Sequence, residues 1–289
     1  MTRTPKVFAA PPTLPRGRWF VELIGAAAGY EVYDAIQART SGDATQAIRA
    51  GRAIFSAERT VHLDPERTFN TFATAHSSVA EVSGYFYGLA HVTITACVLT
   101  FLWTRRPAAY ARLRTALVIL SLLGLAVFWL APVAPPRFAV AGLTDTLAAH
   151  DILGAAHLHK GLVNLYAAMP SLHLAWATWC AASIVLTSPH RRARYLAWLY
   201  PVVMAADVLM TANHYFFDIV AGVVLTGLVL PWYRPRLEPE SCGAARPAPA
   251  PAVAPEPAVA CEPRAVLEPH GTVPAPLARP PVPAAEVDA

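Results

Sequence analysis

Apolar segments separated by short polar connections dominate the first 233 residues of the chain. A helix needs roughly 20 apolar residues to cross the hydrocarbon core of a membrane. Five segments meet or approach that length: about 84–103, 114–132, 171–188, 195–211 and 214–233. A sixth, about 19–37, also contains acidic residues, and Glu22 interrupts the apolar region that a signal peptide would need. We interpret it as an uncleaved first helix, so the pattern predicts an all-α, polytopic membrane protein with a bundle of six transmembrane helices.

Clusters of positive charge predict the orientation of this bundle. They precede the first helix, fill the connections between helices two and three and between helices four and five, and follow the sixth helix: Arg3, Lys6, Arg16, Arg18, Arg105, Arg106, Arg112, Arg114, Arg191, Arg192, Arg194, Arg234 and Arg236. With six helices all four clusters fall on one side, and the positive-inside rule places that side in the cytoplasm. Abundant Ala, Arg and Pro indicate a GC-rich bacterial genome. We therefore expect a multi-pass protein of the bacterial plasma membrane with both termini in the cytoplasm.

The same pattern divides the chain into three regions: a cytoplasmic segment 1–18, a membrane domain 19–233 and a tail 234–289. The tail is rich in Pro and Ala and has no apolar period, which predicts a disordered cytoplasmic extension. On the opposite side of the membrane we expect a loop at 133–170 and a segment at 38–83. In that segment the helix-like spacing of Val61, Phe69 and Phe72 predicts a helix along the surface. Its arginines are balanced by four acidic residues, Asp43, Glu58, Asp64 and Glu66.

Composition agrees with a membrane protein. The 289 residues are 55% hydrophobic and 15% charged, whereas soluble domains typically carry about 25% charged residues. The net charge of +4 is small, and the arginines lie in short clusters beside apolar runs, which argues against nucleic acid as a partner. Of the four cysteines, Cys97 and Cys180 fall inside apolar segments, and no metal-type spacing occurs.

Five polar residues are predicted to meet near the outer membrane surface. Arg137 follows the third helix, Ser171 and His173 begin the fourth, and His214 begins the sixth with Asp218 at i+4 on the same helical face. Each has an ordinary interpretation alone: a cap for the serine, an interfacial group for a histidine, an anchor for the arginine. A carboxylate inside a span is costly without a partner or a role. Together they favour a reactive site.

The chemistry of this set suits phosphoryl transfer. Asp218 bonded to one nitrogen of His214 would fix its tautomer and leave the other nitrogen as a nucleophile. The first helical turn at Ser171, Leu172 and His173 presents unpaired N–H groups to an anion, and Arg137 adds charged donors. The second histidine can act as general acid and base. These parts predict a two-step transfer through a phosphohistidine that requires no metal or other cofactor.

Three stretches carry a family resemblance. "AAMPSLHLAW" and "NHYFFDIVAG" resemble the second and third signature motifs of the type 2 phosphatidic acid phosphatase superfamily. "APPRF" resembles the first motif as used by the inositol phosphorylceramide synthase branch, and "YFYGLAH" and "DPERTFN" are supporting likenesses. The resemblance covers about 20–233. It implies His214 as nucleophile, Asp218 as its orienter, His173 as general acid and base, Arg137 and Ser171 as phosphate contacts, and a site facing away from the cytoplasm.

The chain departs from the usual motifs at two places. Leu130 stands where the first motif usually has a lysine, and Asp207 and Val208 stand where the third has Ser-Arg. The inositolphosphotransferase branch shares these departures. Lys160 and His91 are our candidates for the remaining phosphate contacts. Asp207 has two open interpretations, assistance to the site or pairing with a buried group.

Several functions fit these observations. The first is a lipid phosphatase or phosphotransferase that acts on membrane lipid phosphate esters, with an alcohol or inositol-type acceptor and transfer of a headgroup such as phosphoinositol in the second case. The alternative is a membrane transporter or lipid flippase with interfacial ionisable residues, against which no internal repeat is seen. A catalytically inactive scaffold is a third reading. The stretch "AHLHK" contains His157 and His159 in an H-x-H pattern. That pattern is common in loops, and we assign no metal to it.

Overall fold

A computed structural model describes four parts of the chain: residues 25, 29, 44–152 and 165–233. Three expectations lie outside these residues, apart from Gly25 and Gly29: the N-terminal segment 1–18, the first span at 19–37 and the tail at 234–289. Within the described ranges every regular element is a helix, and one isolated parallel bridge joins Val133 to Ala167. The predicted all-α class is therefore confirmed for the part of the chain that the structure describes, while the count of six helices stays a prediction.

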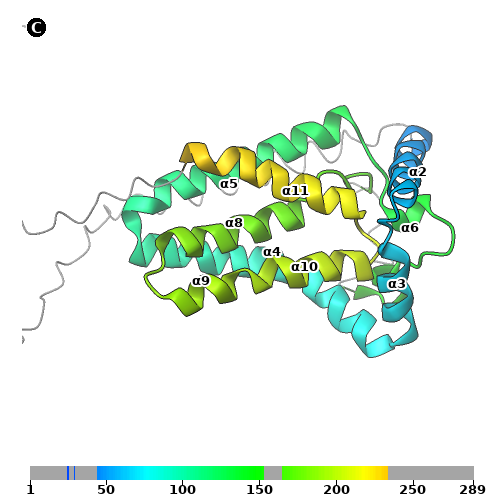
Figure 1. The fold of residues 1–289 in the computed structure, drawn as a ribbon, viewed down its shortest axis with the longest axis horizontal. Helices are drawn as coiled ribbons and strands as arrows, with labels where there is room; N and C mark the ends of the chain where they lie inside the picture. The colour runs from blue at the N-terminus through cyan, green and yellow to red at the C-terminus, as the bar shows by residue number, and fades with distance from the viewer. Residues whose placement is uncertain (1–24, 26–28, 30–43, 153–164, 234–289) are drawn as a thin grey trace, which may run out of the picture. The chain divides into compact units, whose positions relative to one another are not determined.

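Five helical segments form a bundle in which neighbouring helices run roughly side by side (Figure 1). They are α4 (Ser77–Arg105), α5 (Pro107–Leu130), α8 (Leu172–Thr187), α9 with α10 (Arg191–Ala197 and Leu199–Met210), and α11 (Phe216–Val229) with its 3-10 extension η2 (Leu230–Tyr233). Four of these are long and apolar enough to cross a membrane. The exception is α8, whose 16 residues are fewer than the roughly 20 of a full span.

The surface of the bundle explains why it suits a membrane. Its helices expose large aliphatic side chains, including Val82, Val92, Val118, Leu122, Val202, Val224 and Leu228. The interior holds small and polar side chains, as at Ala175 and Thr226, among large apolar ones such as Trp179. In a soluble protein such an exposed apolar belt would be a liability. Lipid is the environment in which this distribution is stable.

At the centre of the bundle, α8 contacts α4, α5, α10 and α11. Small residues allow the close approach of its neighbours. A Cβ built at Gly222 of α11 would meet the carbonyl oxygen of Ser171 and, at 3.2 Å, the amide nitrogen of Ala175. The beginning of α8 is thereby fixed against the first half of α11.

Four further helices gather at one end of the bundle (Figure 1): α2 (Ala44–Thr60), α3 (Glu66–Ala75), α6 (Pro136–Ala139) and α7 (Thr146–Ala149). The expected helical character of the segment 38–83 is present in α2 and α3, but its buried face is formed by polar side chains. Val61 and Phe72 are about half exposed, whereas Glu58 and Glu66 are fully buried. The polar face turns inward because those carboxyl groups receive backbone hydrogen bonds from the start of α11.

The arginine clusters of the described residues lie at the other end. α4 ends at Arg105 and α9 begins at Arg191, and the Nε of Arg106 donates to the carbonyl of Thr187 at 2.8 Å, which joins the two connections. The chain therefore separates its positively charged connections from the end that carries the polar helix starts.

Candidate active site

His214 lies in the turn between α10 and α11, two residues before the helix begins at Phe216. The expectation that His214 begins the helix and meets Asp218 across one helical face was wrong. The Oδ2 of Asp218 accepts the N–H of Tyr215 at 2.9 Å and caps the helix start, so the chain before Tyr215 leaves the helical path. The two side chains still meet, because the turn folds the imidazole back over the carboxylate.

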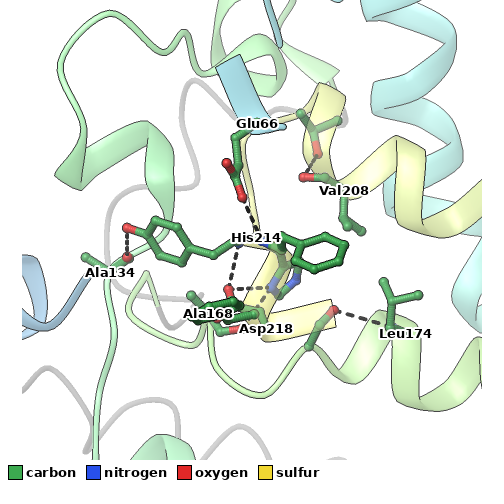
Figure 2. Close-up of polar contacts among 12 residues, drawn as sticks. Glu66, Ala134, Ala168, Leu174, Val208, His214 and Asp218 are labelled. Carbon is green, nitrogen blue, oxygen red and sulfur yellow. Dashed lines mark hydrogen bonds and ion pairs between the residues drawn. The ribbon is translucent and has the colours of Figure 1, made fainter. Parts of the chain in front are cut away.

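The Nδ1 of His214 faces two oxygen acceptors (Figure 2). The carbonyl of Ala168 lies at 2.8 Å and the Oδ2 of Asp218 at 3.4 Å. Both favour the tautomer in which Nδ1 carries the proton, which leaves the lone pair on Nε2. That Nε2 is buried and has no hydrogen-bond partner among the described residues. Its lone pair is therefore available to a ligand at this site.

His173 is the second residue of α8 and contacts three aromatic rings. Its ring stacks on Tyr87 with centroids 4.2 Å apart, lies 4.4 Å from His91, and lies 5.6 Å from His214. Its Nε2 is buried and lacks a partner within the described part of the chain. Two buried imidazoles thus each keep one nitrogen available.

Arg137 in α6 is held near the turn that carries His214 by charge and backbone contacts. Its Nε lies 3.1 Å from Asp145, its guanidinium lies over the ring of Phe138 at 4.6 Å, and its N–H donates to the carbonyl of Ala212 at 3.1 Å. Burial lowers the pKa of Arg137, and the charge of Asp145 opposes that shift. The Nη1 atom is buried without a partner among the described residues, so it remains available to an anion.

Ser171 is the N-cap of α8, as the sequence predicted. Its hydroxyl accepts the N–H of Leu174 at 3.4 Å, and its own N–H donates to the backbone carbonyl of Asp218 at 3.0 Å. The amide of Ser171 is thus already engaged. The first residues of an α-helix have no acceptor within the helix for their N–H groups. Leu172 and His173 therefore supply the amides that an anion at this helix start would meet.

The remaining candidates differ in outcome. The Nδ1–H of His91 in α4 donates to the carbonyl of Tyr87, 3.0 Å away, and the ring contacts His173 and Trp176. It is a neighbour of the proposed acid and base. Lys160 and the histidine-rich stretch 157–159 lie outside the described residues.

Asp207 is paired with a buried group, which decides between its two interpretations. Its Oδ1 accepts the hydroxyl of Ser83 at 2.6 Å inside the bundle, and the side chain is buried in α10. At the other departure from the motif, Leu130 is 76% exposed at the end of α5. Neither side chain belongs to the group around His214.

Two residues near His214 were not predicted. Glu66 accepts the N–H of Phe216 and Glu58 accepts that of Phe217, each at 2.6 Å, and both carboxyl groups are fully buried. Charged residues in a polar amphipathic segment ordinarily face water, so the sequence favoured a surface role. One signal could have found them: both open a Glu-Arg-Thr triplet, eight residues apart.

Comparison with known proteins identifies the family of the chain. A family profile described as the PAP2 superfamily matches residues 52–232. A phosphoinositol dihydroceramide synthase of Bacteroides thetaiotaomicron is 25% identical over 171 residues, which cover 53% of this chain and 55% of that protein. The chain thus aligns with about half the length of this relative. No solved structure matches.

The profile covers well over half of the chain, including the site residues described above. PAP2 abbreviates the type 2 phosphatidic acid phosphatase superfamily, which the motifs resemble. The profile and the relative thus agree on one superfamily. The chain belongs to the PAP2 superfamily.

Proposed function

We propose that this protein is a membrane enzyme that cleaves a lipid phosphate ester through a phosphohistidine formed on His214. The observation that carries the proposal is a pair of buried imidazole rings 5.6 Å apart, His173 and His214, whose Nε2 atoms both lack partners in the described residues. Arg137 is joined through its backbone to Ala212, two residues before His214, and its Nη1 is likewise buried without a partner there. Two such imidazoles with a guanidinium nearby in the fold suit a phosphate group, with one imidazole as nucleophile and one as acid.

The first half-reaction exchanges one bond for another. The lone pair on Nε2 of His214 attacks phosphorus, the bond from phosphorus to the leaving oxygen breaks, and His173 gives that oxygen its proton. Asp218 and the carbonyl of Ala168 hold the Nδ1 proton of His214 as positive charge develops on the ring. Arg137 and the first-turn amides of α8 neutralise the phosphate oxygens.

The second half-reaction decides between hydrolysis and transfer. Water or an alcohol gives its proton to His173 and attacks phosphorus, and the bond to His214 breaks. The similarity to a phosphoinositol dihydroceramide synthase supports transfer of a phospho-headgroup such as phosphoinositol to a lipid alcohol. Attack by water would make the same site a lipid phosphatase.

We also propose that the site faces outward from a bacterial plasma membrane, with both termini in the cytoplasm. The arginines at the ends of α4 and α9 lie at the bundle end opposite His214, which supports this orientation under the positive-inside rule. A transporter or flippase has less support, because the polar groups described above gather at one end of the bundle and not at the midplane.

The test compares wild type with His214→Ala in detergent. Both proteins receive headgroup-labelled phosphatidylinositol and phosphatidic acid, with and without a ceramide or diacylglycerol acceptor. We expect wild type to form an acid-labile, base-stable phosphoprotein and His214→Ala to form none. Free phosphate would indicate a phosphatase, and label moving to the lipid alcohol a transferase. Turnover retained by His214→Ala, or lost from wild type in EDTA, would contradict the mechanism.

A further inference from the structure

The first turn of α11 has its N–H groups taken by carboxyl groups of the same chain. The N–H of Tyr215 is bound by Asp218, that of Phe216 by Glu66, and that of Phe217 by Glu58. Figure 2 shows the carboxyl group of Glu66 reaching the chain directly beside His214. Asp218 caps its own helix, whereas the two glutamates come from α3 and α2, about 150 residues earlier in the chain.

The two glutamates also contact each other. Both side chains are fully buried and bind neighbouring N–H groups through Oε1, while each Oε2 is buried without a hydrogen-bond partner among the described residues. Two carboxylates buried side by side would repel each other, so one of the pair holds a proton. Burial raises the pKa of Glu58 to about 9, with the Phe217 N–H opposing the shift, and burial also raises the pKa of Glu66. The proton therefore belongs on Glu58, whose free Oε2 can donate it to the free Oε2 of Glu66.

We propose that Glu58 and Glu66 form a proton-sharing pair that positions His214 for catalysis by clamping the first turn of α11. They are positioning residues that act through the backbone of Phe216 and Phe217, and the proposal rests on the proposed role of His214 as nucleophile. Each oxygen Oε1 holds one backbone amide at 2.6 Å. His214 immediately precedes this turn. These two hydrogen bonds therefore determine the angle at which its Nε2 approaches phosphorus.

A proton between the carboxyl groups stabilises the arrangement in which Glu58 and Glu66 both bind the first turn of α11. The groups that face the pair are acidic or phenolic: Asp218 and Tyr215 from the start of α11, and Asp64 beside Glu66. Two buried negative charges there would repel each other and Asp218. One shared proton leaves a single charge, which the positive end of the α11 dipole favours.

Because the proton is on Glu58, the substitutions Glu58→Gln and Glu66→Gln should have different effects on the pair. In Glu58→Gln the amide can still accept the N–H of Phe217 with its oxygen and donate to Glu66 with its nitrogen. In Glu66→Gln the amide nitrogen would meet the hydroxyl of Glu58, and two donors would face each other. Glu58→Ala removes both bonds.

The kinetic test measures kcat and KM for release of labelled headgroup from phosphatidylinositol by each variant, with Glu81→Ala as control because Glu81 is an exposed glutamate on α4. We expect Glu58→Ala to lower kcat by roughly 10- to 100-fold, since misplacing a reacting group by about 1 Å costs that much. KM should change by less than about twofold, because Arg137 and α8 are untouched.

Glu58→Gln should restore most of kcat, and Glu66→Gln should not. Equal kcat for Glu58→Ala and Glu58→Gln would overturn the proposal, as would full activity of Glu66→Gln.

A second test needs no substrate. In the infrared difference spectrum of wild type minus Glu58→Gln, we expect the C=O stretching band of a protonated carboxylic acid at neutral pH, and subtraction removes any other protonated carboxyl group. Absence of the band would show that the pair holds no proton and would overturn the proposal even if Glu58→Ala failed to fold. If His214→Ala retained turnover, the proposed function would fail while this spectrum still reported on the pair.

Discussion

The imidazole of His214 illustrates how distances assign roles to single residues. Its Nδ1 lies closer to the carbonyl of Ala168 than to Asp218, 2.8 Å against 3.4 Å. The carbonyl can therefore fix the tautomer without the carboxylate. What only Asp218 supplies is a negative charge beside a ring that becomes positive during the reaction.

Asp218→Asn should therefore slow the enzyme without abolishing it. A hydrogen bond to a charged group is worth about 1.5–3 kcal/mol, so we expect kcat to fall roughly 10- to 100-fold with KM little changed. Steady-state kinetics with labelled phosphatidylinositol, beside His214→Ala as the inactive reference, measures this. A loss as complete as that of His214→Ala would mean that the Ala168 carbonyl does not maintain the tautomer.

Arg137 offers a second test at this scale. Its unpartnered Nη1 and planar guanidinium suit two oxygens of one phosphate, which a lysine ammonium cannot match. We expect Arg137→Lys to weaken inhibition by orthovanadate, a mimic of five-coordinate phosphorus, by roughly tenfold or more. Asp145→Asn is the matched control, because it removes the ion-pair partner and keeps the arginine. Unchanged vanadate inhibition in Arg137→Lys would remove Arg137 from the phosphate site.

The sequence could predict these site residues because polar side chains at the ends of apolar segments are rare and costly. It could not predict the contribution of Ala168, since a backbone carbonyl has no mark in the sequence and its position depends on the path of the loop. Glu58 and Glu66 were missed for a related reason. Buried carboxyl groups that bind distant backbone amides look the same in a sequence as carboxylates facing water.

Among the elements, α11 shows both the strength and the limit of reading helices from hydrophobicity. The apolar stretch near 214–233 predicted its existence and length, because a long apolar run has few alternatives. The starting residue differed by two, since capping by Asp218 and the positive φ of 51° at Ala212 redirect the chain before Phe216. Such local geometry depends on hydrogen bonds that residue types alone do not specify.

Two glycines on α11 provide a matched pair for testing helix packing. A Cβ at Gly222 would meet the backbone of Ser171 and Ala175, whereas a Cβ at Gly227 would meet no atom within 4 Å. We expect Gly222→Ala to lower the melting temperature in detergent and reduce activity, because backbone cannot move aside as a side chain can. Gly227→Ala should be neutral or stabilising by about 0.5–1 kcal/mol through helix propensity. Equal melting temperatures for the two variants would contradict the close contact of α8 and α11.

For the whole molecule, the buried glutamates link stability to pH. The pKa of Glu58 is raised from 4.5 to about 9 by burial, against the Phe217 N–H, with nearby Glu66 and Asp218 adding to the rise. Between those values the folded protein holds a proton that the unfolded chain has released, so stability falls as pH rises through this window and is fully present below it. We expect the melting temperature in detergent to decline from pH 4.5 towards 9, and less steeply in Glu58→Gln. Parallel slopes for both proteins would show that Glu58 ionises normally.

Two backbone hydrogen bonds described above have a consequence for how substrate choice can change. The N–H of Arg137 is bonded to the carbonyl of Ala212, and the N–H of Ser171 to that of Asp218, at 3.1 and 3.0 Å. Main-chain bonds thus set the spacing between Arg137, Ser171 and the turn that carries His214, and most side-chain substitutions leave these bonds intact. Under the proposed function, loops around the site can then diverge to accept new alcohols while the reaction centre keeps its dimensions. On that proposal, an engineer who exchanged such loops would change the acceptor and retain the chemistry.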